Sequence, residues 1–303
     1  MRIALHDSDK TDFPNLALMK LAAWHKMIGD EVSWFLPIMS YDRIYSSKVF
    51  TFTPEDPYLP DDTIRGGTGY GNLEELPEEI DWMEPDYSIY PKVDHAIGYL
   101  TRGSVRNCPW CIVPKKEGYI KPYRKWAEIK RPDSRDIVFM DNNVLASEFG
   151  ISQMEEMIGQ NVRVDFNQGL DARLITPEVA KILSELKWID GTIRMSADTN
   201  AMLKVVLDKI DLLKGYGVRP RRIFVYVLVQ DIESAEKRCI ALRDAGAKPF
   251  AQPYRDFENN IEPTKQMKDF AHWVNKKACF NTVKTFEEFD TRIRYRRSEH
   301  DSR

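Results

Sequence analysis

The sequence predicts an α/β protein, with a partial (β/α)6 barrel preceded by a small Rossmann-like α/β domain. From residue 93 onward, apolar strand-like runs alternate with helix-like segments, a pattern typical of a parallel sheet. About 165 residues hold these runs, whereas a full eight-stranded barrel needs about 250. An open six-stranded arrangement therefore fits better. The runs lie at 93–101, 136–141, 163–167, 191–196, 222–229 and 248–252.

Residues 1–52 predict the small Rossmann-like domain. Apolar runs at 2–6, 32–39 and 43–50 indicate strands. Between the first two runs, Pro14 suits the first turn of a helix, and the apolar residues from Leu16 to Met27 fall on one broad helical face. We expect a β-α-β-β unit here.

Composition divides the rest of the chain into three parts. Residues 53–92 hold six prolines, four glycines and eleven acidic residues, which indicates a linker or an excursion between domains. Residues 93–260 hold the repeating pattern of the barrel. Residues 261–303 begin with a helix-like segment, expected to close the barrel, and end in a basic tail with five arginines that we expect to be disordered.

The bulk composition excludes several classes of protein. A net charge of −3 gives no general attraction to nucleic acid, and four unevenly spaced cysteines do not make a disulfide framework. Cys239 and Cys279 lie in helix-like sequence, where free thiols are expected. The opening MRIALHDSD does not resemble a secretory signal, and no run approaches the roughly 18 apolar residues that a membrane span needs. We expect a cytoplasmic protein with no membrane partner.

One loop, Thr101 to Gly118, has the residues of a metal or thiol site. It follows the apolar run from Ala96 to Leu100 and holds Cys108 and Cys111 with Trp110 between them. Cysteines on a loop just after a strand are placed for ligation or thiol chemistry rather than for packing. A single CxxC is weak by itself, because zinc half-sites, redox pairs and iron–sulfur sites all use it.

The surrounding residues, TRG-S-VRN-C-PW-C, resemble the signature of the radical S-adenosylmethionine (SAM) enzymes. In that family three cysteines, spaced CxxxCxxC and usually after Arg-Gly, hold a [4Fe–4S] cluster whose fourth iron binds SAM. The resemblance implies that Cys108, Cys111 and the position of Ser104 face the cluster. Ser104 stands where the family has its first cysteine.

Polar residues follow each of the expected strands. Because the working residues of parallel barrels sit at the carboxyl ends of the strands, these groups are expected to line one polar mouth around the cysteine loop. Beyond the cysteine loop, the polar residues include Asp141, Asn142, Asn143, Asp165, Asn167, Gln168, Asp171, Arg173, Arg194, Ser196, Asp198, Tyr226, Gln230, Gln252, Tyr254, Arg255, Asp256, Asn259 and Asn260.

Three segments, DNNVLAS, FNQGLDARL and PYRDFENNIEPT, are similar to radical SAM proteins found in phage and prophage genomes, and the likeness covers nearly the whole chain. It implies a role in cofactor binding for strand-end residues. Asp141, Asn142 and Asn143 would bind the SAM amino group, and Trp110 would lie near the adenine. The ribose and carboxylate contacts would come from Arg194, Ser196, Asp198 and Tyr226, with Asn167 and Gln168 also at the cofactor.

Cobalamin-dependent members of the family have a similar domain before the barrel, with an Asp-x-His-x-x-Gly loop whose histidine binds cobalt. This chain has no such motif, because His25 is followed by Lys-Met-Ile-Gly inside a helix-like segment. We therefore expect a degenerate domain and no cobalamin.

The resemblance implies an enzyme. The cluster would pass one electron, supplied by a donor such as flavodoxin or ferredoxin, to SAM. This releases methionine and a 5′-deoxyadenosyl radical, which abstracts a hydrogen atom from the substrate. A nucleic acid, a peptide or a small molecule would fit as substrate, and Lys115 to Arg131, with seven basic residues and three aromatic ones, is a candidate nucleic-acid surface.

Two other functions stay open. One is a non-catalytic descendant of the family that binds SAM or nucleic acid, for which Ser104 is the argument. The other is a dithiol redox or zinc protein that uses Cys108 and Cys111. The lack of a second CxxC or a histidine pair counts against zinc.

Overall fold

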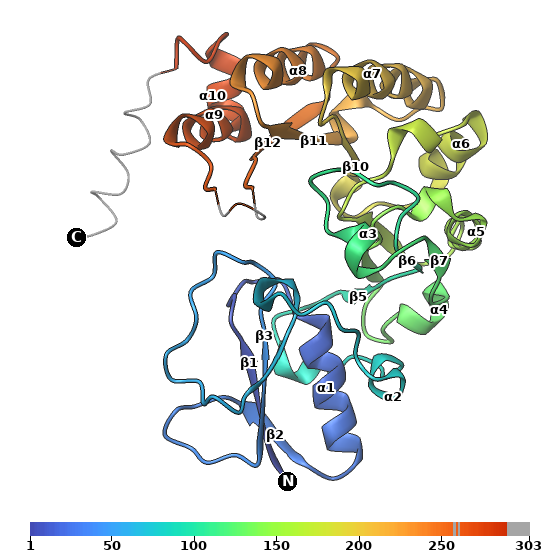
Figure 1. Cartoon of the computed structure of the whole chain (residues 1–303). Coiled ribbons are helices and arrows are strands. Elements are labelled where there is room, and N and C mark those ends of the chain that lie inside the picture. Colours follow the sequence, from blue (N-terminus) through green and yellow to red (C-terminus); the bar gives the residue numbers. More distant parts are fainter. Residues whose placement is uncertain (257–258, 260, 290–303) are drawn as a thin grey trace. The chain divides into compact units, whose positions relative to one another are not determined.

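The structure is a computed structural model that describes residues 1–256, 259 and 261–289 (Figure 1). It divides into two compact units, Met1–Ile97 and Gly98–Arg303. Asn260 and the basic tail beyond residue 289 lie outside the described residues. Within the described part of the chain, none of the helices is both long enough and apolar enough to cross a bilayer.

The N-terminal unit contains a parallel sheet in the order β2-β1-β3-β4, which confirms the β-α-β-β start. Helix α1 begins where the side chain of Asn15 accepts a hydrogen bond from the amide of Leu18, and its buried leucines pack against β1. Segment 53–92 adds the last strand to this sheet. The elements are β1 (Arg2–Asp7), α1 (Leu16–Met27), β2 (Glu31–Trp34), β3 (Arg43–Ser47), β4 (Ile64–Gly66), η1 (Thr68–Tyr70), α2 (Glu78–Asp81) and η2 (Tyr87–Ile89).

A buried polar cluster lies around His6, at the end of β1. The His6 Nδ1 is 2.9 Å from the Ser46 hydroxyl, and its Nε2 is 3.3 Å from a carboxylate oxygen of Asp56. Burial lowers the pKa of His6, and the contact with Asp56 offsets this only in part. The neutral ring is therefore the form that this cluster favours.

We expect the N-terminal unit to lose stability as the pH falls below about 6.5, the ordinary pKa of histidine. Because the pKa of His6 is lower in the folded state, the unfolded chain binds the proton first, and folding then opposes protonation. Urea unfolding at pH 5 and pH 7.5 measures the effect. A His6→Gln variant should show a smaller pH difference, and an equal difference in both proteins would contradict the assignment.

The C-terminal unit confirms the alternation of strands and helices. Its strands form two three-stranded sheets, in the orders β5-β8-β9 and β10-β11-β12, and the pairs β8–β9, β10–β11 and β11–β12 are parallel. Two isolated parallel bridges join β9 at Val164 to Trp188, and Leu170, shortly after β9, to Met195 of β10. The strands of these two sheets are β5 (Ala96–Gly98), β8 (Asp136–Phe139), β9 (Arg163–Phe166), β10 (Ile193–Ser196), β11 (Ile223–Val229) and β12 (Lys248–Pro253).

The long helices of this unit begin at caps that the sequence provides. Thr176, Thr199, Asp231 and Thr264 each accept a hydrogen bond from an amide in the first turn of the helix that follows. The expected closing helix is shorter than segment 261–277, and a further short helix follows it. The α-helices are α3 (Val113–Lys116), α4 (Trp126–Ile129), α5 (Glu148–Glu156), α6 (Pro177–Glu185), α7 (Asn200–Gly215), α8 (Ile232–Asp244), α9 (Lys265–Asn275) and α10 (Lys277–Thr282).

The two faces of the second sheet differ in character. Along β11, Ile223, Val225, Val227 and Val229 are fully buried, and α8 packs on this strand and on β12. Figure 1 shows α7 and α8 along one side of these strands. The alternate residues of β11, including Phe224 and Tyr226, are only half-buried. Because successive side chains of a strand point to opposite faces, the sheet has one packed face and one more accessible face.

Candidate functional site

The cysteine loop begins at a small antiparallel hairpin, β6 (Thr101–Arg102) with β7 (Lys121–Pro122). Gly103 has a positive φ of 86°, and the next amide, that of Ser104, donates to the carbonyl of Gly118 at 3.1 Å. A Cβ on Gly103 would lie 2.6 Å from the Tyr119 carbonyl oxygen. Only glycine fits here, so the residue before Ser104 fixes the path of the loop.

Cys108 and Cys111 share one turn, in which the amide of Cys111 donates to the carbonyl of Cys108 at 3.0 Å. Both are free thiols, with Cys108 half-buried and Cys111 exposed. Desolvation of the thiol and the nearby Cys108 and Glu117 raise the pKa of Cys111. A raised pKa disfavours the thiolate, which is the form that both redox exchange and metal ligation use. Cys239 is buried and Cys279 half-buried, and both are free as expected.

The Ser104 hydroxyl is held by two neighbours. Its Oγ accepts a hydrogen bond from the amide of Arg106 at 3.1 Å and lies 3.4 Å from Nδ2 of Asn143. Asn143 follows β8, and its side chain is buried with an Oδ1 that has no partner among the described residues. Ser104 of the cysteine loop therefore contacts Asn143 at the end of β8.

Glu117 joins three parts of the loop. Its carboxylate accepts from Arg102 at 2.9 Å, from the amide of Gly103 at 2.9 Å and from the side chain of Asn142 at 3.0 Å. The Glu117 side chain is almost fully buried. Three donors around one carboxylate anchor both ends of the loop, and they tie Asn142 to the loop rather than leaving it free.

Asp171 makes the connection to the end of β9. Its carboxylate pairs with Arg106 of the cysteine loop at 2.9 Å and with Arg173 at 2.7 Å. Arg173 also interacts electrostatically with Cys108 and Asp198. The loop, the end of β9 and the end of β10 therefore meet around the guanidinium groups of Arg106 and Arg173.

Asp141 points into the protein. It is 1% exposed, and its carboxylate accepts from the amides of Leu100 and Thr101 at 3.0 and 2.6 Å and from the Thr101 hydroxyl at 2.6 Å. Burial raises its pKa to about 6, against these hydrogen bonds. These contacts hold the turn between β5 and β6, so Asp141 belongs to the scaffold of the site.

The accessible face of the sheet carries a charged pair and an aromatic cluster. Arg194 of β10 forms a bidentate ion pair with Asp165 of β9, in which its Nε and Nη2 donate to the two carboxylate oxygens at 2.8 and 2.9 Å. The Arg194 guanidinium also lies 5.1 Å from the ring centre of Phe224. Tyr226 donates to the carbonyl of Asn167 at 2.9 Å and packs against Phe224 and Phe250. Side chains from β9, β10, β11 and β12 therefore contribute to one surface.

The remaining predicted residues lie at the same strand ends. Asp198 accepts from the amide of Leu228 at 3.3 Å, has Ser196 as a further partner, and has a pKa raised mainly by burial. Gln168 is exposed and donates to the side chain of Asn167 at 3.1 Å. Trp110 is half-buried in the turn between the two cysteines.

Sequence reasoning missed Glu117 and Arg106. Glu117 lies within a basic segment, 15 residues from its partner Arg102, and Arg106 lies 65 residues from Asp171. Nothing in the local sequence marks either contact. His25, which the sequence excludes as a cobalt ligand, makes protein contacts through both ring nitrogens. They face Asp30 at 2.7 Å and the Tyr45 hydroxyl at 3.1 Å.

The donor set fits an iron–sulfur cluster at two positions and not at the third. Cys108 and Cys111 offer soft thiolates, but Ser104 offers a hard hydroxyl that is already hydrogen-bonded. Within the described residues, no group of three or more His, Cys, Asp or Glu side chains is placed to hold a metal ion.

Comparison with known proteins gives no family for this chain. No protein-family model matches it. No curated protein matches it either.

Proposed function

We propose that the C-terminal unit is a radical SAM-type domain built as an open partial barrel. The observation that carries the proposal is the ion pair between Arg106 and Asp171, at 2.9 Å, which brings the cysteine loop to the end of β9. In a partial barrel the cluster loop follows the first strand and faces the carboxyl ends of the next strands. Cys108 follows β5, and Asp171 follows β9.

The order of the strands supports the same proposal. All six strands lie in sequence order within their sheets, and the Leu170–Met195 bridge connects the end of β9 to β10. Strands that follow one another in this way, with helices between them, are the repeating unit of a (β/α) barrel. The accessible face, with Asp165, Arg194 and Tyr226, would then line the interior.

Within such a domain the residues of this chain divide into three sets. Cys108 and Cys111 are the ligands that we assign to a cluster, with Ser104 at the weak third position. Asp171 and Glu117 position the loop. The residues that we assign to SAM, by their place at the same strand ends, are Trp110, Asn142, Asn143, Asn167, Gln168, Arg194, Ser196, Asp198 and Tyr226.

A cytoplasmic enzyme with a small electron-transfer donor, such as flavodoxin or ferredoxin, follows from this proposal. The half-buried face offers a cation, a carboxylate and aromatic rings to a substrate. We propose no cobalamin for the N-terminal unit, since both nitrogens of His25 already have protein partners.

Ser104 favours a second candidate, a non-catalytic descendant that keeps the SAM-binding strand ends. Its hydroxyl contacts Arg106 and Asn143 and so contributes to the loop without any metal. A dithiol redox or zinc protein, which would use the same free thiols of Cys108 and Cys111, is the third candidate.

The Cys108→Ala/Cys111→Ala variant should lose most of the iron and sulfide that the natural chain takes up in anaerobic reconstitution. The reason is that a cluster depends on thiolate ligands. Cys279→Ala is the matched control, because Cys279 is half-buried and lies in α10, and it should keep the natural iron content. Iron and sulfide analysis, with the absorbance of the cluster, measures the outcome.

Three results separate the candidates. Iron that depends on Cys108 and Cys111 supports the radical SAM proposal. SAM binding by calorimetry without iron supports the non-catalytic descendant. Reversible oxidation of the two thiols, with neither iron nor SAM bound, supports the dithiol protein and overturns the proposal.

A further inference from the structure

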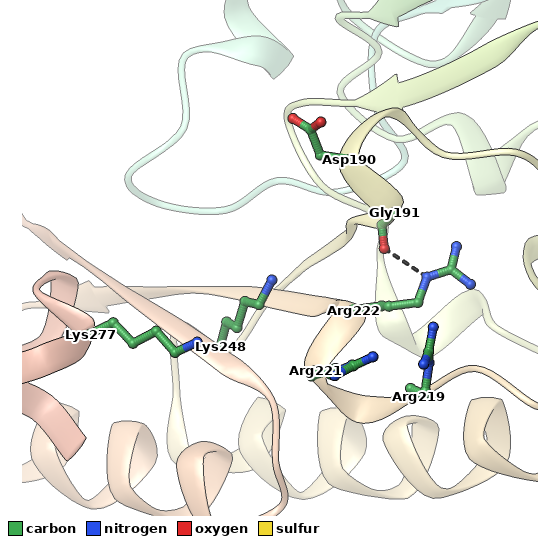
Figure 2. Close-up of a pocket in the computed structure, with 7 residues that line it drawn as sticks. All are labelled: Asp190, Gly191, Arg219, Arg221, Arg222, Lys248 and Lys277. Carbon is green, nitrogen blue, oxygen red and sulfur yellow. Dashed lines mark hydrogen bonds between the residues drawn. The ribbon is translucent and has the colours of Figure 1, made fainter.

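A basic pocket of about 440 Å³ lies at the amino ends of β10, β11 and β12 (Figure 2). Four separate segments supply its lining: the turn before β10, the turn before β11, the first residue of β12 and the first residue of α10. Figure 2 shows the two lysines on one side of the pocket and the three arginines on the other. The lining residues are Asp190, Gly191, Arg219, Arg221, Arg222, Lys248 and Lys277.

The charges in this pocket are not balanced. Asp190 is the one acidic residue among the lining residues, against five cations. Arg222 is fixed, because its Nε donates to the Gly191 carbonyl at 2.8 Å. The turn that presents this carbonyl has positive φ angles at both Asp190 and Gly191. The Arg222 guanidinium is therefore fixed by a hydrogen bond, and the pocket lining carries an excess of positive charge.

The other four cations are available to a ligand. In the described part of the chain, the side chains of Arg219, Arg221, Lys248 and Lys277 have no ion-pair or hydrogen-bond partner, and all four are exposed. Like charges held together without a counter-charge repel one another. An anion that binds among them would relieve this repulsion.

This pocket is separate from the proposed cluster site. The cysteine loop lies at the carboxyl ends of the strands, and the basic pocket lies at their amino ends. β11 has seven residues, so the length of a strand, about 20 Å, separates the two ends. The pocket is therefore a second binding surface, and its test does not depend on iron or SAM.

We propose that this pocket binds the phosphodiester backbone of a nucleic acid. Arginine is suited to phosphate because its planar guanidinium can donate two parallel hydrogen bonds, and three arginines lie here within four residues. The lining has no aromatic ring or amide side chain that would read a base. The chain has a net charge of −3, so the attraction is local and independent of sequence.

The test uses the full chain, without iron or SAM, and a fluorescein-labelled single-stranded oligonucleotide of about 20 nucleotides in a fluorescence anisotropy titration. Arg219→Gln/Arg221→Gln/Lys248→Gln should weaken binding about tenfold or more at low salt. It should also reduce the slope of log affinity against log salt by about 2, since each phosphate contact contributes about 0.7 for a single strand.

Lys181→Gln/Lys204→Gln/Lys237→Gln is the matched control. It removes the same charge from exposed positions on α6, α7 and α8 and should bind like the natural chain. Circular dichroism checks that both variants fold. Equal loss in both triple variants, or no binding by the natural chain, overturns the proposal. Binding of inorganic tripolyphosphate, but not of the oligonucleotide, assigns the pocket to a small anion instead and also overturns it.

Discussion

Ser104→Cys should raise the iron content toward four per chain in anaerobic reconstitution, with a matching rise in sulfide. The natural chain should hold the cluster poorly, because a serine hydroxyl is hard and stays protonated near neutral pH, whereas a thiolate binds iron strongly. The loop should keep its path, since Gly103 and the Ser104 amide fix it through the backbone. Reductant-driven release of 5′-deoxyadenosine from SAM should rise by about tenfold or more.

Ser184→Cys is the control for this experiment. Ser184 lies on α6, donates to the Lys181 carbonyl and is far along the chain from the cysteine loop, so a thiol there should not change iron uptake. If the natural chain already holds four irons and cleaves SAM as fast, serine is a competent ligand and the argument from hard and soft donors fails. If neither protein takes up iron, the non-catalytic descendant becomes the better proposal.

Gly103→Ala adds only one methyl group, but among such changes at the site it should cause the largest loss of stability. The new Cβ would lie 2.6 Å from the Tyr119 carbonyl oxygen and 2.8 Å from that of Gly118, so the hairpin β6–β7 has to open. We expect a loss of about 3 kcal/mol in the free energy of unfolding, from the left-handed conformation and the steric clash together. Iron uptake should fall with it. Urea unfolding and iron analysis measure both effects.

Gly118→Ala separates strain from the clash. Gly118 has a similar positive φ of 70°, but an added Cβ would meet nothing within 4 Å. This variant should lose only about 1 kcal/mol, the cost of a left-handed residue that carries a Cβ. Equal losses in the two variants would show that the close approach at Gly103 does not matter.

The sequence was sufficient for most of the secondary structure, because the strands are apolar runs and the helices have caps. The runs at 136–141, 163–167 and 222–229 correspond to β8, β9 and β11 within a few residues. The strand expected at 32–39 ends at Trp34 in the structure, since Pro37 lacks the amide hydrogen that a strand interior needs. β4 was missed, because Ile64–Gly66 is short and lies among prolines and glycines.

The site was harder to predict because its order comes from contacts between distant residues. Strand ends indicated where Asn143, Asp198 and Tyr226 would lie. The partners that hold them could not be predicted, since a strand end gives the place of a side chain but not its direction. Asp141 shows this difference, because it follows β8 as expected but turns inward to the amides of Leu100 and Thr101.

The division of β11 into a packed face and an accessible face has a consequence for how such a protein diversifies. Ile223, Val225 and Val227 pack on the face that the helices cover, while Phe224 and Tyr226 alternate with them and pack among the rings of the accessible face. Substitutions at the alternate positions therefore change the accessible face and leave the packing under the helices in place. Descendants of this chain could acquire new preferences for the molecules they accept while inheriting the same scaffold.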